Sequence, residues 1–150
     1  TKKSIMIKDL VFNKLITHSD NRGFFREILR ASSDSLSHEI GQVSHSAVNK
    51  GVIKAWHGHK YQYQWTYVLQ GNLRVAVVDQ RKDSITHNEI VEFTCGEFGD
   101  YSMYGFPPGV FHGYQNISAK AQIIYITSGT YDIEDELRIP KDNNIIEFKW

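Results

Sequence analysis

The sequence predicts an all-β fold, a sandwich or small barrel of which the jelly roll is one form. Its apolar residues come in short runs of about five to eight, rich in β-branched and aromatic types and bounded by Gly, Asn, Asp or Pro. No helical periodicity separates these runs. A chain of 150 residues has room for one hydrophobic core, so we expect a single domain over residues 1–150.

The clearest strand is Leu73–Val77, in which apolar and other residues alternate between the turn signals Gln70–Asn72 and Asp79. Taken in chain order, the expected strands are Ser4–Phe12, Gly51–Trp56, Gln64–Leu69, Leu73–Val77, Asn88–Phe93, Gln122–Thr127 and Ile145–Trp150. Ile28–Ile40 carries four serines in a helix-poor pattern and is expected to be a loop or at most a turn of helix. Asp132–Leu137 is expected to be another short turn.

Composition excludes several classes of protein. Lys and Arg together number 17, as do Asp and Glu, so the net charge is zero and gives no general attraction to nucleic acid or to an anionic membrane. Cys95 is the only cysteine, which excludes an intramolecular disulfide framework and fits a reducing compartment. No apolar run approaches the roughly 20 residues of a membrane-spanning helix. We therefore expect a cytoplasmic protein with neither nucleic-acid nor membrane partners.

The histidines form the most informative pattern. His57 and His59 lie two apart and would point to the same side of a strand, and His112 follows the turn Pro107–Gly109. The full spacings are G-x5-H-x-H-x4-Q-x6-G from Gly51 to Gly71 and P-x-G-x2-H-x3-N from Pro107 to Asn116. Together they resemble the two motifs of the cupin superfamily, whose jelly-roll barrel points these residues inward. Metal-binding cupins have Glu at the position of Gln64, so a metal held by His57, His59 and His112 is the weaker alternative.

A second resemblance covers nearly the whole chain. Asp20–Glu27 resembles the D-x-R-G-x-F-x-E signature of the dTDP-4-dehydrorhamnose 3,5-epimerase family of cupins. Five further blocks that resemble the family follow in order: Gln42–Ser46, Lys54–His57, Val78–Ser84, Pro108–Tyr114 and Tyr125–Tyr131. Members of this family invert carbons beside a ketone in nucleoside-diphosphate 4-keto-6-deoxy sugars used in surface polysaccharides, such as those of lipopolysaccharide and O-antigen. The resemblance implies no cofactor.

The resemblance also implies residue roles. His57 would be the base and Tyr131 the acid, with Tyr125 nearby in the pocket. Arg22 would bind the diphosphate, because a guanidinium can contact a phosphate through two donors. Like Arg22, seven further residues would bind the substrate: Phe25, Glu27, Gln42, Lys54, His59, Gln64 and His112. The family commonly forms homodimers by pairing N-terminal strands, and Ser4–Phe12 is the segment expected to do so here.

The sequence departs from the family at three places. Lys54 stands where the family has Arg, and Gln64 falls where the family has an enolate-stabilising Lys. The family's carboxylate partner for the catalytic histidine lies beyond the tryptophan that corresponds to Trp150, so Asp79 and Asp83 are candidates to orient His57. These departures leave three alternatives to epimerisation: a nucleotide-sugar 3,4-ketoisomerase, suggested by His57–Lys60, a sugar-nucleotide binding cupin without activity, and a metal-dependent cupin.

Overall fold

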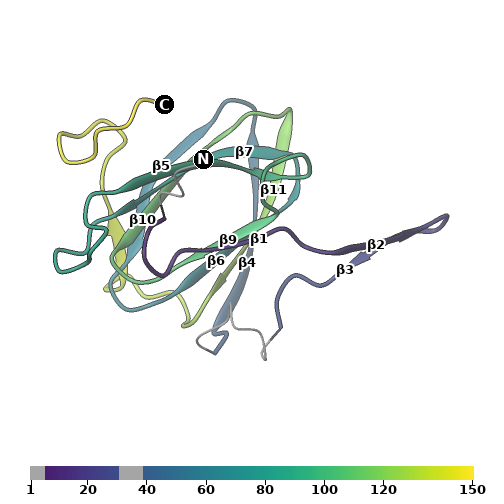
Figure 1. The fold of residues 1–150 in the computed structure, drawn as a ribbon, viewed down its shortest axis with the longest axis horizontal. Coiled ribbons are helices and arrows are strands. Elements are labelled where there is room, and N and C mark those ends of the chain that lie inside the picture. Colours follow the sequence, from purple (N-terminus) through teal and green to yellow (C-terminus); the bar gives the residue numbers. More distant parts are fainter. Residues whose placement is uncertain (1–5, 31–38) are drawn as a thin grey trace.

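The computed structural model describes residues 6–30 and 39–150 and confirms the all-β prediction. In these residues there are twelve strands and no helix (Figure 1). The strands are β1 (Val11–Asn13), β2 (Thr17–Asp20), β3 (Gly23–Arg26), β4 (Gln42–Asn49), β5 (Ile53–His59), β6 (Gln64–Gln70), β7 (Asn72–Asp79), β8 (Ile90–Gly96), β9 (Met103–Phe106), β10 (Val110–Asn116), β11 (Lys120–Thr127) and β12 (Glu136–Arg138). Because the described part contains no helix, it offers no helix that could span a membrane.

Ten of the described strands form two antiparallel five-stranded sheets that face each other, as in a jelly roll. One sheet has the order β1-β9-β6-β11-β4 and the other β12-β5-β10-β7-β8. Consecutive strands therefore alternate between sheets at several points, as β5 and β6 do, which closes a barrel around an interior (Figure 1). Residues from both sheets can therefore reach that interior.

Along β7, successive side chains point to opposite faces of the sheet, and both faces are covered. Leu73, Val75 and Val77 point into the core between the sheets, whereas Ala76 and Val78 belong to a separate cluster on the outer face. All five side chains are fully buried or nearly so. The regular alternation of its core-facing residues between turn signals is why this strand could be predicted from its sequence.

The C-terminal segment covers the outer face of the second sheet, and the prediction of a strand over Ile145–Trp150 is wrong. Its apolar residues Ile146, Phe148 and Trp150 pack instead against Trp56 of β5. The segment makes side-chain contacts with the sheet but no ladder of backbone hydrogen bonds. Its alternating pattern therefore reflects the burial of every second side chain and not a β-strand.

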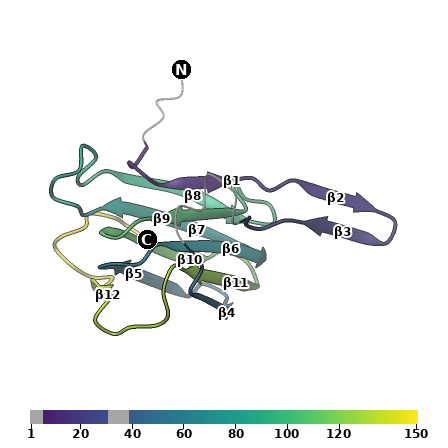
Figure 2. The same ribbon diagram turned by 90° about the horizontal axis from the view of Figure 1, so that it is seen from below.

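The prediction for the N-terminus is wrong over most of its described part. Within Ser4–Phe12, residues 8 and 9 form a turn and only Val11 and Phe12 lie in a strand, β1; Ser4 and its neighbour Ile5 lie outside the described residues. The projecting N-terminal element is instead the hairpin β2–β3, which extends away from the barrel (Figures 1 and 2). Phe24 and Phe25 on this hairpin are 64% and 65% exposed.

Of the two loop predictions, one can be compared with the structure only in part and the other in full. Residues 31–38 of Ile28–Ile40 lie outside the described residues, and the described remainder is neither helix nor strand. Asp132–Leu137 contains the predicted turn at residues 133–135, and its last two residues begin β12. Strands β2, β3, β4, β9, β10 and β12 were not predicted.

Candidate active site

A cavity of about 230 Å³ opens between the two sheets at the centre of the barrel. β5, β10 and β12 line it from one sheet and β6 and β11 from the other. The lining residues are Lys54, His57, Gly58, His59, Gln64, His112, Tyr114, Tyr125 and Glu136. The structure thus brings together six of the predicted site residues, Lys54, His57, His59, Gln64, His112 and Tyr125.

Strand β5 directs His57 and His59 into the cavity, as their spacing predicts. Between them, Gly58 faces the opposite side, where the ring of Phe111 lies against it. A Cβ at Gly58 would meet that ring at 3.0 Å, so a larger residue would displace either the strand or Phe111. This close contact fixes the strand that carries both histidines.

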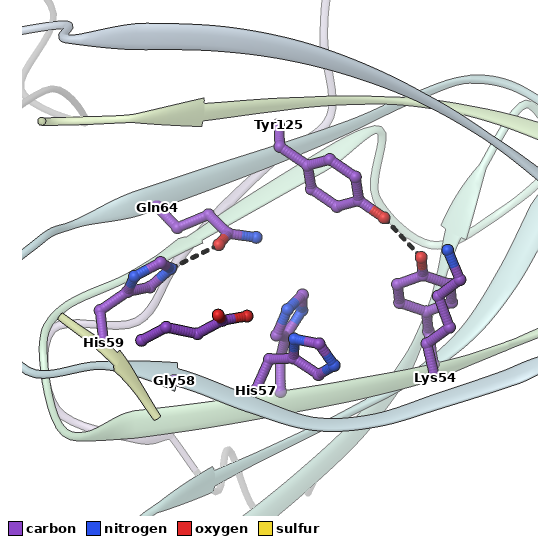
Figure 3. Close-up of a pocket in the computed structure, with 9 residues that line it drawn as sticks. Lys54, His57, Gly58, His59, Gln64 and Tyr125 are labelled. Atoms are coloured by element: carbon purple, nitrogen blue, oxygen red, sulfur yellow. Dashed lines mark hydrogen bonds between the residues drawn. The ribbon is translucent and has the colours of Figure 1, made fainter. Parts of the chain in front are cut away.

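His57 lies in the middle of the cavity (Figure 3). Burial lowers the pKa of its imidazole, and the positive charges of Arg138 and Lys54 lower it further, while Glu136 acts in the opposite direction. No hydrogen bond to the His57 ring is found among residues 6–30 and 39–150. The imidazole is therefore neutral near pH 7 and able to accept a proton from a bound molecule.

His112 forms part of the cavity wall from β10 and is buried. Its Nδ1 lies 2.7 Å from the Tyr104 hydroxyl. Burial lowers the pKa of His112 well below its usual value, and repulsion from His57 and His59 when those rings are protonated acts in the same direction. His112 is thus a neutral imidazole that can donate or accept a hydrogen bond but does not hold a charge.

His59 is held from both sides at one end of the cavity. Its Nδ1 lies 2.8 Å from Oδ2 of Asp135, and its Nε2 lies 2.7 Å from Oε1 of Gln64 (Figure 3). The backbone N–H groups of Tyr61 and Gln62 donate to the other oxygen of Asp135 at 2.6 and 3.0 Å. Burial raises the pKa of the Asp135 carboxyl, but these hydrogen bonds outweigh burial and lower it overall, so the group is a carboxylate.

Two tyrosines and a lysine occupy the other end (Figure 3). The hydroxyls of Tyr114 and Tyr125 form a short hydrogen bond, and burial raises the pKa of both phenols. Tyr125 comes from β11, in the sheet opposite to that of His57. A neutral phenol is a proton donor, so the cavity has a base and an acid on opposite walls.

Tyr131 and Gln42 lie outside this cavity, in an adjoining depression that shares His59 and Glu136 with it. The backbone N–H of Tyr131 donates to Oε1 of Gln42 at 2.7 Å, and Tyr131 is 69% exposed. The structure therefore places Tyr131 at the rim rather than opposite His57.

The remaining three predicted residues lie on or beside the projecting hairpin. Arg22 pairs with Asp20 at 2.6 Å, Phe25 is exposed, and Glu27 pairs with Arg30 at 2.7 Å. None of them lines the cavity of the same chain.

The acids suggested as partners for His57 are engaged elsewhere or remote from it. Asp79 accepts hydrogen bonds from Arg81, Ser84 and Thr86, so it holds the β7–β8 loop. Asp83 does not line the cavity. The acid that does contact a site histidine is Asp135, which sequence reasoning missed because a lone acid in a turn has no distinguishing pattern. Tyr114 was also missed as a lining residue.

The three histidines do not form an evident metal site. His59 has both ring nitrogens in hydrogen bonds and His112 has one. Residues 6–30 and 39–150 contain no group of three or more His, Cys, Asp or Glu side chains arranged to hold a metal ion.

Comparison with known proteins relates this geometry to a family. The chain is 39% identical over 148 residues to a spore coat polysaccharide biosynthesis protein of Bacillus subtilis strain 168, covering 97% of each. It is 30% identical to a probable low-salt glycan biosynthesis epimerase of Haloferax volcanii, covering 96% of this chain and 94% of that one.

Solved structures agree with these sequence relatives. A dTDP sugar isomerase of Desulfovibrio desulfuricans G20 superposes with a TM-score of 0.89 at 25% identity, covering 96% of this chain and 92% of the other. An epimerase of Legionella pneumophila Philadelphia 1, solved with dTDP-4-keto-L-rhamnose, superposes with a TM-score of 0.80 at 26% identity, covering 91% and 75%. A protein-family model described as dTDP-4-dehydrorhamnose 3,5-epimerase matches residues 4–150 of this chain. The protein belongs to the dTDP-4-dehydrorhamnose 3,5-epimerase family.

Proposed function

We propose that this protein epimerises a nucleoside-diphosphate 4-keto-6-deoxy sugar at C3, C5 or both, in the cytoplasm and without a cofactor, for the synthesis of a surface polysaccharide. The observation that carries the proposal is the position of His57 and Tyr125 on opposite walls of one cavity in a protein of this family. Inversion of a carbon requires a proton to leave one face of the ring and another to arrive on the opposite face.

In this mechanism His57 takes the proton from the carbon beside the ketone. The C–H electron pair moves into the ring to form an enolate, and the negative charge resides on the former carbonyl oxygen. Tyr125 then gives its hydroxyl proton to the same carbon from the opposite face, which restores the ketone with inverted configuration. Solvent exchange returns His57 and Tyr125 to their starting protonation states.

The assignment of the acid to Tyr125 follows from location. Tyr125 is in the cavity and neutral, whereas Tyr131 is exposed at the rim. Tyr131 and Gln42 are better placed to contact the nucleotide, which must extend from the cavity through the adjoining depression. Lys54, at the Tyr125 end of the cavity, offers a positive charge to the substrate.

A homodimer would give a role to the three predicted residues on or beside the hairpin, Arg22, Phe25 and Glu27. The hairpin β2–β3 projects from the barrel with two exposed aromatic rings, and within residues 6–30 and 39–150 the hydrogen bonds and the ion pair of Arg22 are with Asp20. A second copy that received this hairpin would bury the rings and gain a guanidinium for a diphosphate. We therefore propose that each hairpin completes the substrate site of the partner subunit.

The reaction can be tested by incubation with dTDP-, GDP- and CDP-linked 4-keto-6-deoxyglucose in heavy water, followed by NMR of each ring carbon. Deuterium at C3 or C5 with inverted configuration supports the proposal and identifies the carbon. A keto group moved to C3 without inversion would instead identify a ketoisomerase. Binding without exchange in any of the three forms would identify a binding protein.

A further inference from the structure

Tyr114 and Tyr125 meet across the barrel, at the end of the cavity away from His59. Tyr114 comes from β10, in the same sheet as His57, and Tyr125 comes from β11, in the opposite sheet. Their hydroxyls form a hydrogen bond that joins the two walls (Figure 3). The proposed acid therefore has a second phenol in contact with the oxygen that carries its proton.

This contact is largely shielded from solvent. Tyr114 is 3% exposed and belongs to the core between the sheets, where its ring centroid lies 6.1 Å from that of His112. Tyr125 is partly buried and packs against the same core. Water therefore competes little with the bond, and a hydrogen bond in such surroundings is stronger than one in water.

Tyr114 begins on the wall that carries the base. Its strand β10 pairs directly with β5, where His112 lies opposite His57. Inversion needs the acid on the other wall, which is the wall of Tyr125. The contribution of Tyr114 is therefore to Tyr125 and not to the substrate carbon.

The reaction itself sets the direction of this hydrogen bond. A hydroxyl can donate or accept, so either tyrosine can be the donor in the resting protein. Once Tyr125 has given its proton to the substrate, it is a phenolate with no proton to donate, and Tyr114 must be the donor. The bond changes from a neutral one to a charge-assisted one, which is about twice as strong.

We infer that Tyr114 is a positioning residue that holds the Tyr125 hydroxyl and donates to the phenolate oxygen that forms as Tyr125 delivers its proton. The inference rests on the proposed function, because the phenolate forms only if Tyr125 is the acid. Burial raises the pKa of Tyr125, and the hydrogen bond from Tyr114 acts in the opposite direction. An interaction that strengthens as charge develops speeds protonation without tightening substrate binding.

Tyr114→Phe removes the hydroxyl and keeps the ring that packs in the core. The experiment uses heavy water and whichever of dTDP-, GDP- and CDP-linked 4-keto-6-deoxyglucose the wild type converts. His57 should still remove the substrate proton and exchange it for a deuteron, but delivery from Tyr125 should slow, so more enolate takes a deuteron back from His57. We expect the ratio of inverted to retained deuterated product to fall about 10-fold or more, with little change in KM.

The ratio separates this role from a structural one. Damage to the fold would lower exchange and inversion together, and the ratio would stay unchanged. Tyr114→Leu, which also lacks the hydroxyl, should lower the ratio as Tyr114→Phe does. Tyr61→Phe is the control, because its side chain is 65% exposed and lines neither the cavity nor the adjoining depression. An unchanged ratio in both Tyr114 variants would overturn the inference.

A double variant tests whether Tyr114 acts through Tyr125. Tyr125→Phe alone should exchange deuterium with retained configuration, and adding Tyr114→Phe should not change that rate, since the group that Tyr114 assists is already lost. A further loss of exchange in the double variant would contradict a role through Tyr125. Loss of inversion in Tyr114→Phe with inversion kept in Tyr125→Phe would make Tyr114 the acid and overturn the inference as well.

The contact can be observed without substrate, by 13C NMR of protein labelled at tyrosine Cζ. The Tyr125 signal is identified among the eight tyrosines by its loss in Tyr125→Phe. It should move in Tyr114→Phe, because the Cζ shift responds to hydrogen bonding at the phenol oxygen, and stay in place in Tyr61→Phe. A Tyr125 signal that does not respond to Tyr114→Phe would overturn the inference.

The two proposals fail differently. If the Tyr125 signal moves in Tyr114→Phe but the wild type exchanges no substrate proton, the proposed function fails and the catalytic part of the inference fails with it, while the contact stands. If the wild type inverts its substrate and Tyr114→Phe keeps the wild-type ratio, the inference fails and the proposed function stands.

Discussion

His57 and Tyr125 line the same cavity from opposite sheets, one on β5 and the other on β11 (Figure 3). They are 68 positions apart in sequence, and the crossing of strands between the two sheets places them on facing walls. A base and an acid so arranged can act on the two faces of a ring that lies between them.

Replacement of His57 by Gln should abolish exchange of the α-proton, because no other cavity residue combines a neutral, free ring nitrogen with a central position. We expect kcat to fall about 10³-fold or more, with substrate affinity largely kept. Deuterium incorporation in heavy water and equilibrium binding of the substrate measure the two effects separately.

Replacement of Tyr125 by Phe should leave proton removal intact and impair inversion, because the base remains while the acid is lost. The variant should therefore exchange deuterium into the substrate with retained configuration. Tyr131→Phe is the matched comparison at the rim and should change KM more than kcat. If Tyr131→Phe loses inversion while Tyr125→Phe keeps it, the roles of the two tyrosines are reversed.

The pH dependence of kcat/KM should show an acid limb with a midpoint below 6.5, because His57 must be neutral to act as base and its pKa in the folded protein is lowered from 6.5. Activity is then retained as pH falls through 6.5 and is lost only below it. Arg138→Gln removes one positive charge that lowers this pKa, so the midpoint should rise. A midpoint at or above 7 in the wild type would contradict this account of His57.

Arg22 should act across the dimer. Arg22→Ala and His57→Gln are each expected to be inactive at low substrate concentration, but a 1:1 mixture that exchanges subunits forms mixed dimers with one site that has both residues. Half of the dimers would have one competent site of two, so about a quarter of wild-type activity should return. No recovery despite confirmed subunit exchange would place Arg22 and His57 in the same chain's site, and a monomeric mass in solution would exclude the arrangement altogether.

Asp79 should contribute to stability rather than catalysis. Its carboxylate is buried, and although burial raises its pKa, hydrogen bonds from Arg81, Ser84 and Thr86 lower the pKa overall, well below 3.8. Asp79→Asn should lower the free energy of unfolding by about 2 to 3 kcal/mol at pH 7, measured by urea denaturation.

The sign of the pH effect on Asp79 follows from linkage. A carboxyl with a lowered folded-state pKa stabilises the fold above its unfolded pKa, and this contribution is lost as pH falls from about 3.8 toward the folded-state value. The difference between wild type and Asp79→Asn should therefore shrink below pH 3.8. A difference that is constant with pH would mean that Asp79 acts through shape rather than charge.

The strands that were predictable from sequence are those with strong local patterns. β6, β7 and β11 carry apolar runs between turn signals, and the two-residue spacing of His57 and His59 gave their shared direction. The hairpin β2–β3 was missed because its residues are almost all exposed, so burial imposes no alternation. Ile145–Trp150 has the alternation of a strand but acquires it by packing on Trp56.

The site was predictable as far as the family's motifs reach. The contact between His59 and Asp135, 76 positions apart, depends on β12 pairing with β5, and no local sequence pattern predicts it. The location of Tyr131 at the rim depends likewise on where the chain leaves β11.

The most direct test of the central claim is the NMR spectrum of dTDP-4-keto-6-deoxyglucose after incubation with wild type and His57→Gln in heavy water. We expect deuterium at C3, C5 or both with inverted configuration in the wild type, and no incorporation above the uncatalysed rate in the variant. Equal incorporation in both, or a product with its keto group moved and no carbon inverted, would contradict that claim.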